Sequence, residues 1–508
     1  MPLMYCHAKL KNISQHTVIS AHLFLPDYSP MNRDSFYPAI VCFPLLLMLA
    51  GCAPMHETRQ ALSQHTPAVQ VDTALPTALK NGWPDSQWWL EYHDDQLTSL
   101  INNALQNAPD MQVAEQRIQL AEAQAKAVAT QDGPQLDFSA DMERQKMSAE
   151  GLMGPFALND PAAGTTGPWY TNGTFGLTAG WHLDIWGKNR AEVTARLGTV
   201  KARAAEREQT RQLLAGSVAR LYWEWQTQAA LNTVLQQIEK EQNTIIATDR
   251  QLYQNGITSS VEGVETDINA SKTRQQLNDV AGKMKIIEAR LNALTNHQTK
   301  SLKLKPVALP KVASQLPDEL GYSLLARRAD LQAAHWYVES SLSTIDAAKA
   351  AFYPDINLMA FLQQDALHLS DLFRHSAQQM GVTAGLTLPI FDSGRLNANL
   401  DIAKAESNLS IASYNKAVVE AVNDVARAAS QVQTLAEKNQ HQAQIERDAL
   451  RVVGLAQARF NAGLIAGSRV SEARIPALRE RANGLLLQGQ WLDASIQLTG
   501  ALGGGYKR

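Results

Sequence analysis

Cys52 is the residue in this chain whose surroundings most clearly indicate chemistry. The small residues Ala50 and Gly51 precede it, and an apolar run that ends at Leu49 precedes those. A charged start, an apolar core and small residues before a cleavage point are typical of a secretory signal. Cleavage before Cys52 would leave this cysteine N-terminal and open to lipid modification. We therefore expect Cys52 to carry a covalent lipid.

The segment before Cys52 divides at Met31. From Met31 the chain has a short polar stretch with Arg33 and then the apolar run, so residues 31–51 are predicted to be the signal peptide. Residues 1–30 fit no targeting pattern, and we expect translation to begin at Met31 rather than at Met1. The alternative is a transmembrane anchor, but the run is shorter than the roughly 20 residues that a helical span needs.

His368, Asp371 and His375 are a second group with possible chemistry, because such side chains can hold a metal ion. Their spacing matches no zinc-site pattern, so we expect no metal there. No glycine-rich phosphate loop or nucleophile elbow is visible, and all three cysteines lie at or before residue 52. The sequence therefore predicts that the protein is not an enzyme and has no cofactor besides the lipid on Cys52.

The overall charge excludes one class of partner. The 508 residues include 46 Lys and Arg against 49 Asp and Glu, which gives a formal net charge of −3. A protein that binds nucleic acid usually carries a basic surface that neutralises phosphates. We therefore expect no nucleic acid as a partner.

The chain contains an internal duplication. The stretch GLTAGWHLDIWGKNR at 176–190 is echoed by GVTAGLTLPIFDSGR at 381–395, at an offset of 205 residues. Residues 109–114 are echoed by 329–334, and 253–257 by 460–464, in the same order. This predicts a lipidated N-terminal segment (52–91), a first repeat (92–297), a linker (298–320), a second repeat (321–500) and a C-terminal tail (501–508).

Each repeat contains two segments with the alternation of β-strands. Between Phe175 and Ile185 every second residue is apolar, whereas the residues between them are mostly glycine or polar. This period of two predicts strands with one apolar and one polar face. The predicted strands cover about 134–147, 173–186, 354–364 and 379–391. Alternation alone is equally compatible with a soluble sandwich.

Long helices follow the second strand of each repeat. Residues 190–254 and 395–460 contain no proline, and their apolar residues recur in steps of four and three, as in coiled coils. Each helix would be roughly 100 Å long at 1.5 Å per residue. Glycine turns end both helices, return helices follow at about 259–296 and 468–499, and further helices precede the strands near 96–130 and 321–351. Gly187 and Gly394 lie where strand must bend into helix.

Four strands are too few to close a membrane barrel, which needs at least about eight. Open sheet edges cannot lie in lipid, because their backbone groups would be unpaired. If the hairpins are in a membrane, several copies must therefore pool them, and three copies would supply twelve strands, a plausible even number. In such a barrel we expect His182 and Asp184 to face the lumen.

Taken together, these features resemble the TolC-like outer-membrane efflux proteins, in the lipoprotein branch that serves multidrug pumps. The resemblance rests on the small residues before Cys52, the tryptophans near Trp83 and Trp88, the duplicated strand phrase and the Gly256 and Gly463 turns. It implies a mainly α fold with a small antiparallel β part. It also implies a homotrimer with a twelve-stranded outer-membrane β-barrel, a periplasmic α-helical barrel and an equatorial region that includes the 298–320 linker.

The function that this resemblance implies is passive export. The partners would be outer-membrane lipid, a periplasmic adaptor and an inner-membrane efflux pump, and the cargo drugs and other toxic small molecules. Two alternatives stay open: a lipid-anchored periplasmic coiled-coil scaffold and a type I protein-secretion channel. An enzyme of unrecognised type is a remote third.

The resemblance also assigns roles to the turns between the long and the return helices. They would form the periplasmic tip that contacts the adaptor, through Asn255, Gly256, Ile257, Ala462, Gly463 and Leu464. Glu262, Glu265 and Glu472 could form an acidic ring at the entrance. Most glutamates on helices are simply solvated, so this ring is a hypothesis beside that simpler interpretation.

Overall fold

The computed structural model describes Met55 and residues 62–64, 82–148, 159–160, 165–166, 169–257, 259–296, 302–311 and 321–506. The signal segment and Cys52 lie outside the described residues. The chain separates into two units, residues 1–52 and 53–508, and the second contains everything described below. Within the described residues, no helix combines the length and the apolar composition needed to cross a membrane.

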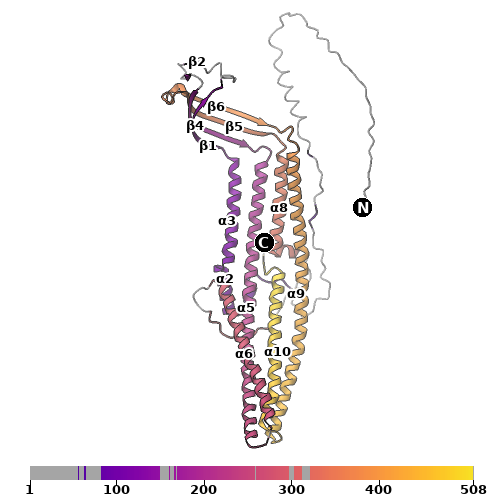
Figure 1. Cartoon of the computed structure of the whole chain (residues 1–508). Helices are drawn as coiled ribbons and strands as arrows, with labels where there is room; N and C mark the ends of the chain where they lie inside the picture. Colours follow the sequence, from indigo (N-terminus) through magenta and orange to yellow (C-terminus); the bar gives the residue numbers. More distant parts are fainter. Residues whose placement is uncertain are drawn as a thin grey trace, which may run out of the picture. The chain divides into compact units, whose positions relative to one another are not determined.

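The fold is mainly helical with one small antiparallel sheet, which confirms the predicted class (Figure 1). The short helix η1 (Trp88–Tyr92) comes directly before the first repeat. The first repeat contains α2 (Asp95–Asn107), α3 (Pro109–Ala129), η2 (Thr130–Asp132), β1 (Gln135–Lys146), β2 (Asn159–Asp160), β3 (Thr165–Thr166), β4 (Trp169–Leu183), α5 (Lys188–Gln254) and α6 (Ser260–Leu294). The second contains α7 (Gly321–Arg327), α8 (Ala329–Ala350), β5 (Asp355–Ala366), η4 (His375–Ala377), β6 (Gln378–Thr387), α9 (Arg395–Asn461) and α10 (Gly467–Ala501).

The duplication is visible in the lengths of the helices. Helices α5 and α9 both have 67 residues, and α6 and α10 both have 35. The two long helices begin 207 residues apart, at Lys188 and Arg395, and end 207 residues apart. The offset of 205 that relates the strand phrases therefore does not continue into the helices, because the connection after β6 is longer than the one after β4.

The helices expected near 96–130 and 321–351 are each broken, which the sequence prediction missed. The first break is at Ala108 (φ −61°, ψ 136°), because a residue before proline disfavours the helical conformation. The second is at Arg328 (φ −102°, ψ 117°), where no proline follows. There the Arg328 guanidinium makes two hydrogen bonds to Asp330, at 3.0 and 2.6 Å, and donates to the Ala501 carbonyl at 3.3 Å. Tertiary contacts hold this break open.

Strands β4 and β6 end earlier than predicted, because two aspartates cap the helices that follow. The Asp184 carboxylate accepts hydrogen bonds from the backbone N–H groups of Asn189 (3.1 Å) and Arg190 (2.9 Å). Asp392 does the same for the start of α9. Such bonds satisfy N–H groups that have no partner inside the helix. The Asp184 side chain is therefore a helix cap, a role that the sequence analysis did not assign to it.

The two bend glycines lie directly before the long helices. Gly187 (φ 75°) and Gly394 (φ 86°) both have left-handed backbone conformations. Such conformations are accessible to glycine at little cost. Figure 1 shows the sheet at one end of α5 and α9, and the turns into α6 and α10 at the other.

The largest core lies where α2, α5, α6 and α10 meet. Tyr222 and Trp223 of α5 are almost fully buried there, against Trp89, Leu97 and their neighbours. The Tyr222 hydroxyl donates to Asp94 Oδ2 at 2.7 Å, and Asp94 also caps α2. Burial and then this hydrogen bond raise the pKa of Tyr222 above its ordinary value.

The segment 302–311 lies over the same core and is held by its backbone. Gln96 of α2 accepts from the Lys305 N–H at 2.9 Å and donates to its carbonyl at 3.2 Å. The fully buried Gln226 of α5 donates to the Lys305 carbonyl at 3.0 Å and accepts from the Val307 N–H at 2.8 Å. The connection between the repeats is thereby tied to α2 and α5.

Gly503, just after α10, provides a test of how tightly this region is packed. Its φ is +95°, and an added Cβ would overlap the Arg327 carbonyl oxygen. We expect Gly503→Ala to lower the free energy of unfolding by about 2 kcal/mol, because backbone strain and the overlap act together. Thermal unfolding followed by circular dichroism measures this. Gly500→Ala is the matched control, since its Cβ meets open space inside a helix and should raise stability by up to about 1 kcal/mol. Equal unfolding temperatures for the two variants would contradict this account.

Candidate functional site

The sheet has four long strands in the order β1, β4, β5, β6, all antiparallel. Strand β4 is central and pairs with β1 from Trp169 to Gly180 and with β5 from Gly173 to Leu183. The short strands β2 and β3 extend one end of β4. Among the described residues, β1 and β6 each pair on one side only. The sheet therefore has two edges whose backbone groups are open to a further strand.

The two faces of this sheet lack a protein core. No residue of β1, β5 or β6 is buried. Apolar side chains of one parity are highly exposed, including Phe138 (67%) on β1 and Met380 (67%) and Val382 (82%) on β6. A sheet normally buries its apolar face against another layer of the protein. The covering layer for this one must come from outside the chain, and lipid fits because it contacts apolar side chains without any hydrogen bond.

Aromatic side chains mark the boundary between sheet and helices. The Trp186 ring stacks on Tyr353 at 5.1 Å, and its Nε1 donates to the Pro354 carbonyl at 2.7 Å. Trp181 Nε1 donates to the Asp132 carbonyl at 2.9 Å. Both tryptophans are partly exposed. Tryptophan and tyrosine are enriched where a membrane meets water, because their rings are apolar and their polar atoms need partners.

The turns at the far ends of α5 and α9 have the same hydrogen bonds. In the first, the Gly256 N–H (φ 72°) donates to the Tyr253 carbonyl and the Ile257 N–H to the Leu252 carbonyl, both at 2.9 Å. In the second, Gly463 (φ 74°) and Leu464 repeat this pattern. Both are Schellman motifs, in which a left-handed glycine closes the helix.

These turns expose apolar side chains. Ile257 is 70% exposed and Leu464 69%, and Tyr253 and Phe460 beside them are also exposed. In a Schellman motif the residue after the glycine usually packs back on its own helix. Exposed side chains at both equivalent positions therefore present an apolar surface to a partner. Asn255 and Ala462, the helix C-caps, lie next to this surface.

The three glutamates of the proposed acidic ring have different surroundings. Glu265 is exposed on α6. Glu472 accepts a hydrogen bond from Arg469 at 2.6 Å, so its charge is largely balanced. Glu262 lies in α6, and its side chain is outside the described part of the structure.

A further acidic residue, Glu241 of α5, was missed by sequence reasoning. Its side chain is 18% exposed; it accepts from Ser471 Oγ at 2.7 Å and pairs with Arg474 at 3.4 Å. Arg474 also donates to Gln457 at 3.2 Å. This network joins α5, α10 and α9. No local pattern predicts it, because Glu241 and Ser471 are 230 residues apart.

The histidine group lies in the segment between β5 and β6. Asp371 pairs there with Arg374 at 3.0 Å, and His375 begins η4. Across the described ranges, no three His, Cys, Asp or Glu side chains form a group that could hold a metal ion.

An open-edged, lipid-compatible sheet joined to paired long helices with apolar turns defines a channel subunit of the outer membrane. The chain belongs to the outer membrane efflux protein family, whose sequence profile matches residues 100–297 and 320–504.

Individual relatives agree with this assignment. The chain is 98% identical over 478 residues to the multidrug resistance outer membrane protein MdtQ of Escherichia coli O157:H7, covering 94% of this chain and 100% of the relative. It is 36% identical over 466 residues to the multidrug resistance outer membrane protein MdtP of Escherichia coli (strain K12), covering 91% and 94%. The crystal structure of the outer membrane protein VceC of Vibrio cholerae is similar with a TM-score of 0.70 and 26% identity, covering 84% and 100%.

The acidic-ring hypothesis predicts a difference between its members. We expect Glu265→Gln to lower the preference of single channels for K⁺ over Cl⁻, because an exposed carboxylate attracts cations. Glu472→Gln should have a smaller effect, since Arg469 already balances that charge. Reversal potentials in planar bilayers under a KCl gradient measure both. Glu437→Gln, on α9 far from the turns, is the control. Unchanged selectivity when Glu262, Glu265 and Glu472 are all replaced by Gln would exclude the ring.

Proposed function

We propose that this protein is the outer-membrane exit duct of a tripartite multidrug efflux system. It conducts drugs and other toxic small molecules passively from a periplasmic adaptor and an inner-membrane pump to the outside. The observation that carries this proposal is the four-stranded sheet without a protein core, continuous with helices of 67 residues. The family assignment and the multidrug resistance named for MdtQ and MdtP support it.

The open edges of the sheet support a homotrimer with a twelve-stranded barrel. Backbone groups left unpaired in lipid are costly, and joining β1 of one copy to β6 of the next removes both edges. The helices have matching surfaces: α3 packs on α5, α5 on α8 and α8 on α9, so α3 and α9 are the outer helices of the layer. Leu120 on α3 is 60% exposed, and Leu409 and Val419 on α9 are 68% and 65% exposed. Copies that join through α3 and α9 would bury these side chains.

The two turns are the proposed contact for the adaptor. The exposed pair Ile257 and Leu464 gives each subunit two equivalent apolar contacts at the ends of equally long helices. A trimer would present six such contacts in a ring. A periplasmic scaffold could use these turns too, but it would have no use for a sheet with an uncovered apolar face.

Two adjacent residues of β6 test the membrane role of the sheet. Val382 lies on the same face of the sheet as the exposed apolar side chains, and Thr383 lies on the opposite face. We expect Val382→Arg to destabilise the inserted trimer by about 2–4 kcal/mol per subunit, because a charge would face lipid near the bilayer midplane. Thr383→Arg should be tolerated because it faces the lumen.

The measurement is the amount of trimer in the outer-membrane fraction, together with drug accumulation by cells that depend on this channel. Val382→Arg should reduce the trimer and raise accumulation, whereas Thr383→Arg should keep the trimer. If both variants insert and export equally well, the proposed orientation of the sheet fails.

Cys52→Ser, expressed with a cleavable signal, separates the lipid anchor from the barrel. We propose that the mature chain begins at lipidated Cys52, so the N-terminal peptide of the natural protein should carry acyl chains by mass spectrometry. The serine variant should lose this lipid and still fractionate as an outer-membrane trimer, because the strands hold it there. A soluble periplasmic monomer would contradict the duct and favour the scaffold. An unmodified Cys52 would contradict lipidation alone.

A further inference from the structure

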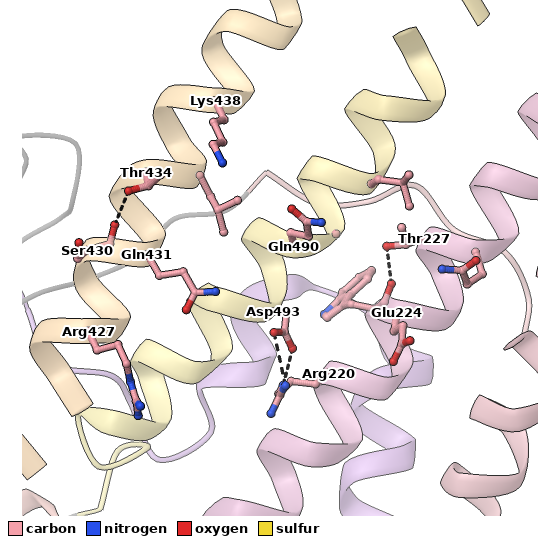
Figure 2. Close-up of a pocket in the computed structure, with 15 residues that line it drawn as sticks. Arg220, Glu224, Thr227, Arg427, Ser430, Gln431, Thr434, Lys438, Gln490 and Asp493 are labelled. Carbon is pink, nitrogen blue, oxygen red and sulfur yellow. Dashed lines mark hydrogen bonds and ion pairs between the residues drawn. The ribbon is translucent and has the colours of Figure 1, made fainter. Parts of the chain in front are cut away.

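A groove of about 690 Å³ lies between α5 and α9, with α10 as its floor (Figure 2). The opposite face of α10 is covered: Leu492 is fully buried against the core around Trp88, and Gln488 donates to the carbonyls of Leu309 and Pro310 at 3.3 and 3.1 Å. In a tube built from copies of this layer, the covered face with its extra segments fits outside. In that arrangement the groove would face the bore.

The groove has one unbalanced charge on each wall. Arg220 of α5 forms an ion pair with Asp493 of α10, and Arg427 of α9 pairs with Asp424 at 2.8 Å, so these charges are balanced. Glu224 of α5 and Lys438 of α9 also line the groove. Neither side chain has a hydrogen-bond or ion-pair partner among the described residues. The carboxylate of Glu224 is thus an unpaired negative charge on the α5 side of the groove, and the ammonium group of Lys438 is an unpaired positive charge on the α9 side.

The other residues that line the groove include both polar and apolar side chains. Thr227, Gln431 and Gln490 offer hydroxyl and amide groups, and in Figure 2 the Gln431 side chain extends from α9 towards α10. Leu435 and Leu486 add apolar surface.

Two buried groups in the lining lack partners. Trp223 is 2% exposed and Gln228 7% exposed, and neither Trp223 Nε1 nor Gln228 Oε1 has a hydrogen-bond partner within the described structure. Leaving a buried donor or acceptor unpaired costs about 1–3 kcal/mol.

We propose that this groove binds elongated organic zwitterions, molecules with an amine at one end and a carboxylate at the other. The amine pairs with Glu224, the carboxylate pairs with Lys438, and a flat body lies over Leu435 and Leu486. Glu224 lies 30 residues before the end of α5 and Lys438 lies 23 residues before the end of α9, so the two charges are on different levels as well as on opposite walls (Figure 2). A molecule that reaches both must be elongated and lie obliquely across α10. The inference rests on the proposed function in treating this zwitterion as cargo.

The test measures binding of ciprofloxacin, a fluorescent zwitterion, to the purified full-length protein in detergent by fluorescence anisotropy. Saturable binding is expected. Glu224→Gln and Lys438→Gln should each weaken it about twofold to fivefold, because each removes one charge pair at an exposed position. The double variant Glu224→Lys/Lys438→Glu should recover much of the affinity, since the ligand can bind in the reverse orientation. Lys240→Gln and Glu437→Gln, on α5 and α9 outside the groove, should bind as the natural protein does.

Ligand analogues give an independent check. The ethyl ester and the N-acetyl derivative of ciprofloxacin each lack one charge and should bind as weakly as the single variants. Failure of the natural protein to bind ciprofloxacin, unchanged affinity in either single variant, or binding of either analogue as tight as that of ciprofloxacin itself would overturn the proposal. If the protein assembles and exports but does not bind ciprofloxacin, only the binding role of the groove is wrong, and the proposed duct function stands. Failure of assembly, by contrast, would overturn the duct.

Discussion

The structure depends on one constraint: an antiparallel sheet with exposed apolar side chains and two open edges is not a finished structure. Phe138 is 67% exposed and Val382 82% exposed, and β1 and β6 have unpaired backbone on their outer sides in the described chain. Water can hydrogen-bond to the unpaired backbone groups at the edges, but contact between water and the apolar side chains is unfavourable. Lipid contacts the apolar side chains favourably but cannot hydrogen-bond to the backbone. Only closure with other copies inside a membrane satisfies both. The need for other copies of the chain and the location in a membrane both follow from this one sheet.

The helices must suit that closure, and the duplication explains how they do. A tube whose wall contains the pair α5 and α6 and the pair α9 and α10 has a level end only if the two pairs have the same length. Helices α5 and α9 agree at 67 residues, and α6 and α10 at 35, although the strand connections differ. Gly256 and Gly463 then end both long helices with the same hydrogen bonds. Six equivalent turns per trimer would therefore lie in one ring.

Elements that depend on local periodicity could be predicted from the sequence, and elements that depend on distant partners could not. The strands follow from alternation, the long helices from apolar steps of four and three, and both turns from their glycines. The break at Ala108 was predictable in principle, since Pro109 follows it. The break at Arg328 was not, because Arg328 donates to the carbonyls of Ala421 and Ala501, which are distant in the sequence. The pairing of Glu241 with α10 likewise joins residues that only the fold brings together.

The balance of charges in the groove suits a passage better than a receptor. A conduit must attract its cargo enough to admit it and weakly enough to release it. Most charges there are already paired within the protein, as Arg220 is with Asp493, so little electrostatic attraction is left for a ligand. Glu224 and Lys438 are exposed, and ion pairs at exposed positions contribute only about 0–1 kcal/mol. A zwitterion would therefore be bound weakly, in one orientation across the wall, and released again.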